Sequence, residues 1–272
     1  MISVLAIIGG TGVYNLSLFD HVEEKLVETP FGECKVILGQ MKEKKVVFMT
    51  RHGVGHKIPP HQINYRANIY ALKSLGVTDI VATTAVGSVD KELAPGTFVF
   101  CDQFIDFTKN RINTFFNGAP LPVVHVDVTE PYCSSIRSLL SEVAKENELS
   151  FTTKGTYICT EGPRFETAAE IAFYNKFGGS VVGMTGVPEA TLAREAEMCY
   201  VTVSMVTNLG AGLSDTSLTH GEVLEVMEAN QKSFHQLISG VIQKWQPNLE
   251  CSCKRALKEF GGFEKCTEAL KK

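Results

Sequence analysis

A carboxylate and an amide each follow an apolar run of this 272-residue chain, in positions suited to reading one ligand. Glu166 belongs to Gly162-Pro-Arg-Phe-Glu-Thr167, and Asn208 belongs to Val206-Thr-Asn-Leu-Gly-Ala-Gly212. An ionised Glu only accepts hydrogen bonds, so it suits the N1–H of a purine with oxygen at C6, while an Asn amide can donate to O6 and face N7. Adenine has no N1–H and would leave the carboxylate unpaired, at roughly 1 to 3 kcal/mol or more. The pair predicts a 6-oxopurine site, although either residue alone is more often structural.

A second group of residues has the chemistry of an anion site. The turn Gly9-Gly-Thr-Gly12 offers backbone N–H groups and the Thr11 hydroxyl. Arg51-His52 and Thr84-Ala85 follow two further apolar runs, and an Arg fork, a hydroxyl and small residues suit phosphate oxygens. A buried structural histidine and a salt-bridged arginine are the alternatives for His52 and Arg51. Because neither a Gly-x-Ser-x-Gly elbow nor a His-Glu-x-x-His helix occurs, the set predicts inorganic phosphate as the nucleophile.

The glycine turn also raises a competing class, a Rossmann-type dinucleotide-binding oxidoreductase. A fingerprint that starts at Gly10 has Gly12 in second place but Asn15 in third. No acidic residue at a strand end stands out about 20 positions further on. The incomplete fingerprint weighs against this class.

Composition narrows the partners and the location. Apolar residues make up 44% and charged residues 21% of the chain, and the net charge is −4, which argues against a nucleic-acid partner bound through its phosphates. The N-terminus lacks a basic leader, and no apolar stretch approaches the roughly 18 to 20 residues of a membrane span. We therefore expect a cytoplasmic protein with no membrane partner.

The eight cysteines divide by their surroundings. Five lie in apolar segments, where a thiol usually behaves as a small buried hydrophobe, namely Cys34, Cys101, Cys133, Cys159 and Cys199. Cys251-Ser-Cys253 and Cys266 lie in a polar C-terminal segment, where a close pair could form a disulfide or bind a metal. Zinc is the weaker interpretation, because no second Cys-x-x-Cys and no His-x-x-x-His accompanies the pair. The sequence therefore predicts no metal site.

Apolar β-rich runs followed at once by polar clusters recur along the chain, which is typical of an α/β fold. The runs are 46–49, 79–82, 156–159, 180–183 and 200–206. Ligands of mostly parallel sheets bind beyond the carboxyl ends of strands, so we expect the polar clusters to converge on one pocket. The predicted fold is a single α/β domain over residues 1–272, a mixed, mostly parallel sheet flanked by helices, with 248–272 as a polar C-terminal tail.

Helical patterns lie between the predicted strands. Apolar residues of 64–75 recur on one helical face, and Gly76 can end that helix. Thr219-His-Gly-Glu222 matches a capping box, and apolar residues then recur at helical spacing toward Trp245. We therefore expect one long helix to close the domain.

Taken in order, the motifs resemble the trimeric purine nucleoside phosphorylase and methylthioadenosine phosphorylase family over residues 2–245. They are Ile-Ile-Gly-Gly-Thr-Gly, Arg-His-Gly-x-x-His, Asn-Tyr-Arg-Ala-Asn-Ile, Thr-Thr-Ala-Val-Gly-Ser, Glu-Gly-Pro-Arg-Phe and Met-Thr-x-Val-Pro-Glu. The resemblance implies phosphorolysis of a purine nucleoside to free base and ribose 1-phosphate. It implies inorganic phosphate as co-substrate, with no metal or organic cofactor.

The resemblance also implies site residues. It assigns phosphate contacts to Thr11, Arg51, His52, Thr84, Ala85 and Thr185. It sets Met184 under the ribose and Asn208, Leu209 and Gly210 along the base, with catalytic roles for Asn208, Arg51 and His52. His125 resembles a position that reaches a neighbouring subunit's site, so a homotrimer or a pair of trimers is implied.

The chain departs from the methylthioadenosine enzymes where the substrate is chosen. Those enzymes have Thr-Asp-Tyr-Asp in place of Thr207-Asn-Leu-Gly210, and a small residue in place of Glu166. The chain therefore resembles the 6-oxopurine branch, which acts on inosine and guanosine. His220 matches a position beside the 5′ substituent and favours a hydroxyl there. Methylthioinosine phosphorylase, methylthioadenosine phosphorylase and a purine sensor without turnover are the other hypotheses.

Overall fold

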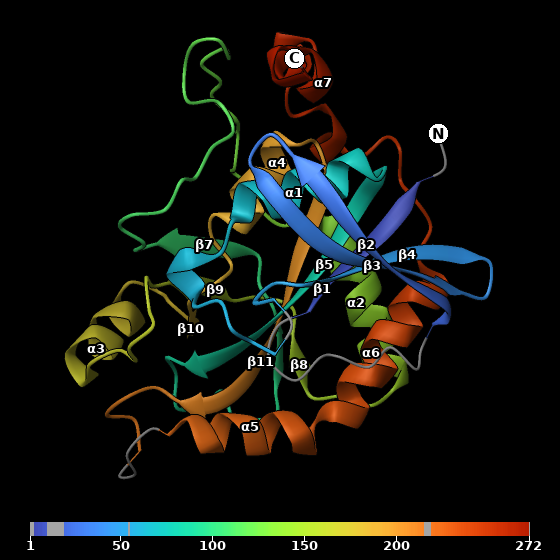
Figure 1. Ribbon diagram of the computed structural model, residues 1–272. Helices are drawn as coiled ribbons and strands as arrows, with labels where there is room; N and C mark the ends of the chain where they lie inside the picture. The colour runs from blue at the N-terminus through green and yellow to red at the C-terminus, as the bar shows by residue number, and fades with distance from the viewer. Residues whose placement is uncertain (1–2, 10–18, 54, 215–218, 272) are drawn as a thin grey trace.

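A mixed β-sheet forms the centre of the chain, and helices cover both of its faces (Figure 1). The computed structural model describes residues 3–9, 19–53, 55–214 and 219–271. Its strands are β1 (Val4–Gly9), β2 (Asp20–Thr29), β3 (Gly32–Met41), β4 (Lys44–Thr50), β5 (Val77–Ser88), β6 (Phe98–Phe100), β7 (Gln103–Asp106), β8 (Phe151–Thr152), β9 (Thr156–Cys159), β10 (Val181–Gly183) and β11 (Cys199–Leu209). Its helices are α1 (Tyr65–Ser74), α2 (Ser134–Glu146), α3 (Ala168–Lys176), α4 (Glu189–Glu195), α5 (His220–Ala229), α6 (Gln231–Lys244) and α7 (Phe263–Cys266).

The long strand β5 joins two parts of the sheet. It pairs in parallel with β1 on one side and with β11 on the other, and its last residues pair antiparallel with β10. Strands β9 and β10 are parallel to each other and therefore run opposite to β5. As a result, β10 runs back along the last residues of β5, and the carboxyl end of β10 comes beside the part of β5 just before Gly87. Such a change of strand direction in a sheet is the kind of place where α/β folds bind ligands. The prediction of a mixed, mostly parallel sheet is confirmed.

Alternation along the central strands separates two cores. In β1, Ala6 and Ile8 face one core, while Leu5 and Ile7 face the other, as the two-residue period of a strand requires. Residues of α1 and α4 pack in the first core. Residues of α2, α5 and α6 pack in the second. The sheet is therefore held between two helical layers, which fixes the backbone on which the polar side chains stand.

Local signals in the sequence set several helix ends. The Asn64 side chain accepts the Ala67 N–H at the start of α1, and Gly76 follows its end with a φ of 78°. The predicted capping box between Thr219 and Glu222 is present at the start of α5. The expectation of one long helix to Trp245 is wrong, because the helix is interrupted at Asn230 and two helices, α5 and α6, take its place.

Asn230 ends α5 and precedes α6, and its side-chain amide donates to the Val226 carbonyl. An asparagine favours such a break because its short side chain competes for backbone hydrogen bonds. Among the described residues, no helix is long and apolar enough to cross a membrane.

The C-terminal segment packs against the domain. Leu257 and Phe263 are buried in the first core. The carboxylate of Glu197 accepts the backbone N–H groups of both residues, at 3.0 Å each. The segment is polar in composition, but its few apolar residues are buried and attach it to the rest of the domain.

Candidate active site

The predicted polar residues gather around one cavity at the junction of β5, β10 and β11. The cavity measures about 820 Å³ including its open mouth, within the range of small-molecule sites. The predicted residues that line it are Arg51, His52, Thr84, Ala85, Glu166, Met184, Thr185, Asn208 and Gly210. These residues belong to motifs that are far apart in the sequence, and the fold brings them together.

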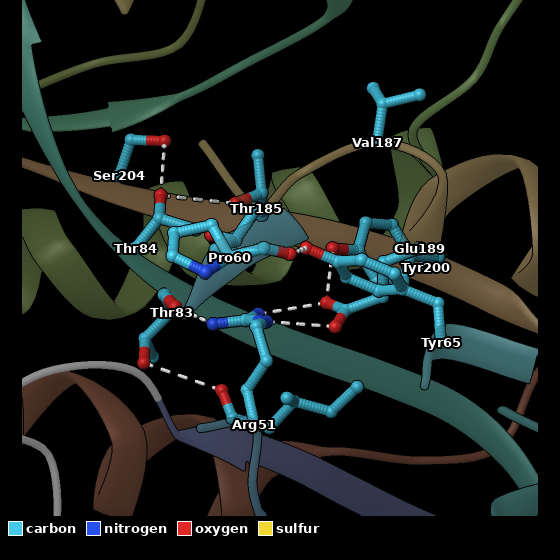
Figure 2. A network of polar contacts seen from close by, with 12 residues as sticks. Arg51, Pro60, Tyr65, Thr83, Thr84, Thr185, Val187, Glu189, Tyr200 and Ser204 are labelled. Carbon is cyan, nitrogen blue, oxygen red and sulfur yellow. Dashed lines mark hydrogen bonds and ion pairs between the residues drawn. The ribbon is translucent and has the colours of Figure 1, made fainter. Parts of the chain in front are cut away.

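Arg51 follows β4 and is 1% exposed. Figure 2 shows its guanidinium group between Glu189 and Thr83. Its Nε and Nη2 donate to the two carboxylate oxygens of Glu189 at 2.8 Å each, and its Nη1 donates to the Thr83 carbonyl at 2.9 Å. Burial lowers the pKa of Arg51, but the charge and hydrogen bonds of Glu189 raise it above its usual value. A guanidinium has five N–H groups, so one on each Nη remains for a ligand after these bonds.

His52 lies beside Arg51 and is 5% exposed. Burial and the Arg51 charge lower its pKa to about 4, so its imidazole is neutral at pH 7. Its Nδ1 lies 2.8 Å from the Ile58 carbonyl and must carry the ring proton to donate there. The Nε2 atom is then an acceptor, able to take a hydrogen bond from a protonated phosphate oxygen or from a sugar hydroxyl.

Two threonines and a small residue continue this end of the cavity. Thr84 and Ala85 belong to β5, and Thr185 follows β10. The Thr84 hydroxyl lies 3.0 Å from that of Ser204 on β11, and the Thr185 N–H donates to the Tyr157 hydroxyl at 3.4 Å. The cavity wall here is polar and, apart from the paired Arg51, uncharged.

Glu166 lies in the loop between β9 and α3 and is partly buried. Its Oε1 accepts the Thr160 hydroxyl at 2.7 Å. Burial raises the pKa of Glu166, although the Thr160 hydrogen bond partly opposes the shift. A carboxylate with one oxygen fixed in this way can offer the other to an N–H group of a ligand.

Asn208 stands at a β-bulge near the end of β11. The register with β5 shifts between Val206 and Asn208, so Asn208 pairs with Gly87. The Thr207 hydroxyl donates to its Oδ1 at 2.9 Å, and its Nδ2 donates to the Leu209 carbonyl at 3.0 Å. A Cβ at Gly87 would lie 3.1 Å from Nδ2, so glycine allows the amide to pack there. The bulge, the hydroxyl and the glycine together direct a fixed amide dipole into the cavity.

The cavity lining therefore contains two chemically different sets of groups. One offers a carboxylate and an amide to a planar heterocycle, and the other offers Arg51 N–H groups and hydroxyls to an anion. Met184 also lines the cavity. This arrangement can hold a nucleoside and a phosphate together and stabilise negative charge on the departing base.

The sequence matches the family model of the Phosphorylase superfamily over residues 4–243. The chain belongs to this superfamily. It is similar to a probable 6-oxopurine nucleoside phosphorylase of Dictyoglomus turgidum, with 54% identity over 94% of this chain and 97% of the relative. It is also similar to a 6-oxopurine nucleoside phosphorylase of Pyrococcus furiosus, with 52% identity over 95% and 99%.

A solved structure agrees with the phosphorylase fold. A methylthioadenosine phosphorylase from an Antarctic soil metagenomic library superposes with a TM-score of 0.88, at 34% identity, over 98% of each chain. Membership of the superfamily favours phosphorolysis over the dinucleotide-binding oxidoreductase considered from the glycine turn.

For four predicted residues of this phosphorylase, the described part of the structure gives no place in the cavity lining. Leu209 and His125 are described but are not among the residues that line the cavity, and His125 is exposed. Thr11 lies outside the described residues. His220 begins α5, and its side chain lies outside the described part of the chain. For these four positions, the roles drawn from the resemblance remain predictions.

Sequence analysis missed two residues that shape the phosphorylase site. Glu189 closes the quoted motif Met184-Thr-Gly-Val-Pro-Glu189, is 0% exposed and accepts the Tyr200 hydroxyl besides Arg51 (Figure 2). A buried arginine needs a buried anion as its partner. The signal that could have revealed Glu189 was therefore the presence of an arginine in one motif and a glutamate in another. Arg111 donates to Glu161, to Tyr65 and to the carbonyls of Thr160, Glu161 and Val187, so it fixes the backbone behind Glu166.

Proposed function

We propose that this chain is a purine nucleoside phosphorylase that cleaves 6-oxopurine nucleosides, such as inosine and guanosine, to free base and ribose 1-phosphate. The observation that carries the proposal is that Glu166 and Asn208 share a cavity with Arg51, Thr84 and Thr185. The first pair matches the N1–H and O6/N7 edges of a 6-oxopurine. The other three match the oxygens of phosphate.

The proposed reaction is a displacement at C1′ of the ribose. A phosphate oxygen forms the new bond to C1′ while the bond from C1′ to N9 breaks, and its electron pair leaves with the purine. The ribose becomes cationic and is stabilised by the phosphate charge. The purine becomes anionic and is stabilised by Asn208, which uses the Nδ2 hydrogen that Leu209 does not take. Glu166 holds the base through N1–H and does not act as a general base.

The remaining parts of the proposal concern partners and location. The reaction uses inorganic phosphate as co-substrate and needs no organic cofactor or catalytic metal. The working unit is a homotrimer or a pair of trimers, to which His125 contributes across subunits. The enzyme acts in the cytoplasm.

The deciding experiment is phosphate-dependent base release by the purified chain from inosine, adenosine, methylthioadenosine and methylthioinosine, compared side by side. We expect kcat/KM to be highest for inosine. Omitting phosphate should abolish release, which separates phosphorolysis from hydrolysis.

Other rankings would contradict parts of the proposal. Preference for methylthioadenosine would remove Glu166 and Asn208 as selectors of the base. Preference for methylthioinosine would keep the base selection and remove His220 as a hydroxyl partner. Binding of hypoxanthine without any turnover would make the chain a purine sensor.

A further inference from the structure

Four cysteine sulfurs meet far from the nucleoside cavity. Cys133 precedes α2, Cys199 begins β11, and Cys251 and Cys253 lie in the C-terminal segment. Their Sγ atoms all lie within 4.8 Å of one another. Three of these side chains are buried, and Cys251 is partly exposed. The fold thus supplies to the Cys-x-Cys pair the two further thiols that its sequence spacing lacks.

We propose that these four cysteines form a structural zinc site that fastens the C-terminal segment to the domain.

The distances fit a metal ion better than a disulfide. Four sulfurs bound tetrahedrally at about 2.3 Å from zinc are separated by about 3.8 Å. The Sγ atoms of Cys133 and Cys251 lie 3.7 Å apart, far beyond the roughly 2.05 Å of a disulfide bond. Four thiolate ligands of one ion are the donor set of a closed structural zinc site, with no position left for substrate or water.

The surroundings suit an anionic metal centre. Zinc bound by four thiolates carries a net charge of about −2, because each thiol gives up its proton on binding. Cys133 is the N-cap of α2, a helix of 13 residues, where the helix dipole stabilises negative charge. Lys254 directly follows Cys253 and pairs with Asp79 at 3.1 Å, which holds this end of the Cys-x-Cys turn against the start of β5.

The other four cysteines behave differently. Cys34, Cys101, Cys159 and Cys266 each lie within hydrogen-bond distance of a nearby oxygen and are not part of the four-sulfur cluster. The chain therefore provides its own control positions.

The site is separate from the reaction. Cys199 begins β11 and Asn208 lies near its other end, so at about 3.3 Å per residue they are roughly 30 Å apart. The metal would act on stability, by joining the segment around Cys251 to α2 and to β11. The inference does not depend on the identity of the nucleoside.

Metal content of the full-length chain tests the site directly. The protein is purified under reducing conditions from cells grown with zinc, and its metals are quantified by mass spectrometry. We expect about one zinc per chain. The reduced, metal-stripped chain is then titrated with Co²⁺, which should give the intense visible bands of tetrahedral thiolate coordination, saturating at one equivalent.

Two single substitutions define the ligands. Cys251→Ser changes the partly exposed ligand, so the risk of misfolding is small, and it should weaken Co²⁺ binding about tenfold or more. Cys266→Ser changes a buried thiol of the same segment outside the cluster and should leave binding unchanged. Removing the metal should lower Tm in the wild type and in Cys266→Ser but not in Cys251→Ser.

Other results would overturn the inference. The inference fails if the reduced wild-type chain holds no stoichiometric zinc and gives no cobalt bands. This test does not depend on the folding of a variant. Another contrary result is a non-reduced chain whose mass is lower by the hydrogens of two disulfides and whose cluster thiols do not react in denaturant. Equal Co²⁺ binding by Cys251→Ser and the wild type would also contradict it.

Discussion

Asn208 is the residue whose geometry is most closely tied to the chemistry. Its amide is fixed by Thr207 and by the Leu209 carbonyl, so it meets the developing purine anion without having to reorient. Asn208→Ala should lower kcat for inosine by about 100-fold or more, as removal of one preorganised donor does in other enzymes. Steady-state kinetics measures this change, and the Tm shows whether the variant is folded.

The control for this change is a remote asparagine. Asn147→Ala removes the amide that donates to Val143 at the end of α2 and should leave kcat unchanged. If folded Asn208→Ala kept the wild-type rate, Asn208 would have no part in the mechanism.

Glu166 should determine how the reaction rate falls at low pH, the acid limb of the pH profile. Burial raises the pKa of this carboxyl, and only its ionised form accepts N1–H, so kcat/KM for inosine should fall as pH decreases through a value above that of an ordinary Glu. In Glu166→Gln this limb should disappear and the preference for inosine over adenosine should shrink. The measurement is kcat/KM for both nucleosides between about pH 5 and 8.

A nearby carboxylate serves as the control. Glu170→Gln keeps the capping role at α3, where glutamine is also accepted, and leaves the cavity lining intact. It should retain the acid limb, displaced toward lower pH because the Glu170 charge helps to raise the pKa of Glu166. An unchanged acid limb in Glu166→Gln would assign that limb to another group and remove Glu166 from base recognition.

At the scale of single residues, sequence analysis found the groups that touch the cavity and missed those that hold them. Arg51 begins the Arg-His-Gly-x-x-His motif and Glu166 follows Glu-Gly-Pro-Arg-Phe, so their types and positions indicate an anion site and a base site. Glu189 and Arg111 were missed because their partners are far away in the sequence, at Arg51 and at the loop before α3. The fold decides which distant residues pair, and the spacing of motifs along the sequence does not show this.

At the scale of elements, β5 positions the base pocket through a residue without a side chain. A Cβ at Gly87 would lie 3.1 Å from Asn208 Nδ2 and 3.3 Å from Val182 Cγ1. Gly87→Ala should therefore displace the amide and lower kcat roughly tenfold or more, since misplacement of about 1 Å can cost 100-fold. Thermal unfolding and kinetics are measured on the same preparation.

A second glycine gives the matched control. At Gly240 a Cβ would lie 2.5 Å from Val143 Cγ1, between α6 and α2. Gly240→Ala should lower stability by about 1 to 3 kcal/mol through overpacking and leave kcat unchanged. If Gly87→Ala changed stability alone, the strand would not be setting the position of Asn208.

Strands and helices were predictable where a single sequence pattern determined them. The run Thr156–Cys159 was predicted with the bounds of β9, because an apolar run ends there at a polar motif. The hairpin of β2 and β3 was missed, because β2 is largely exposed and lacks the apolar alternation of a buried strand. The break at Asn230 was missed because the apolar period continues across it, and only the local competition of the amide ends α5.

At the scale of the whole molecule, the order of the strands and the meeting of the four cysteines could not be read from one sequence. Cys133 and Cys199 were predicted to be buried hydrophobes, and burial is correct for both. That they face Cys251 and Cys253 depends on how α2, β11 and the C-terminal segment pack. Each of these contacts joins residues more than 50 positions apart, so only the assembled fold shows the cluster.

The segment 107–133 gives a reason to expect that subunits share active sites. It contains neither helix nor strand, extends away from the sheet (Figure 1), and exposes Ile112, Val123 and Val128. Burying these side chains against a neighbouring subunit would be favourable. His125 lies on this segment, apart from its own cavity lining, so we expect it to serve the cavity of a neighbour.

Mixing two inactive variants tests this sharing. His125→Ala and Asn208→Ala are refolded separately and together at equal amounts, and phosphorolysis of inosine is measured. In a symmetric trimer, about a quarter of the sites in the mixture combine an intact Asn208 with an intact neighbouring His125, so activity should rise well above that of either variant alone. Self-contained sites would give no such gain, because every chain in the mixture carries one of the two defects.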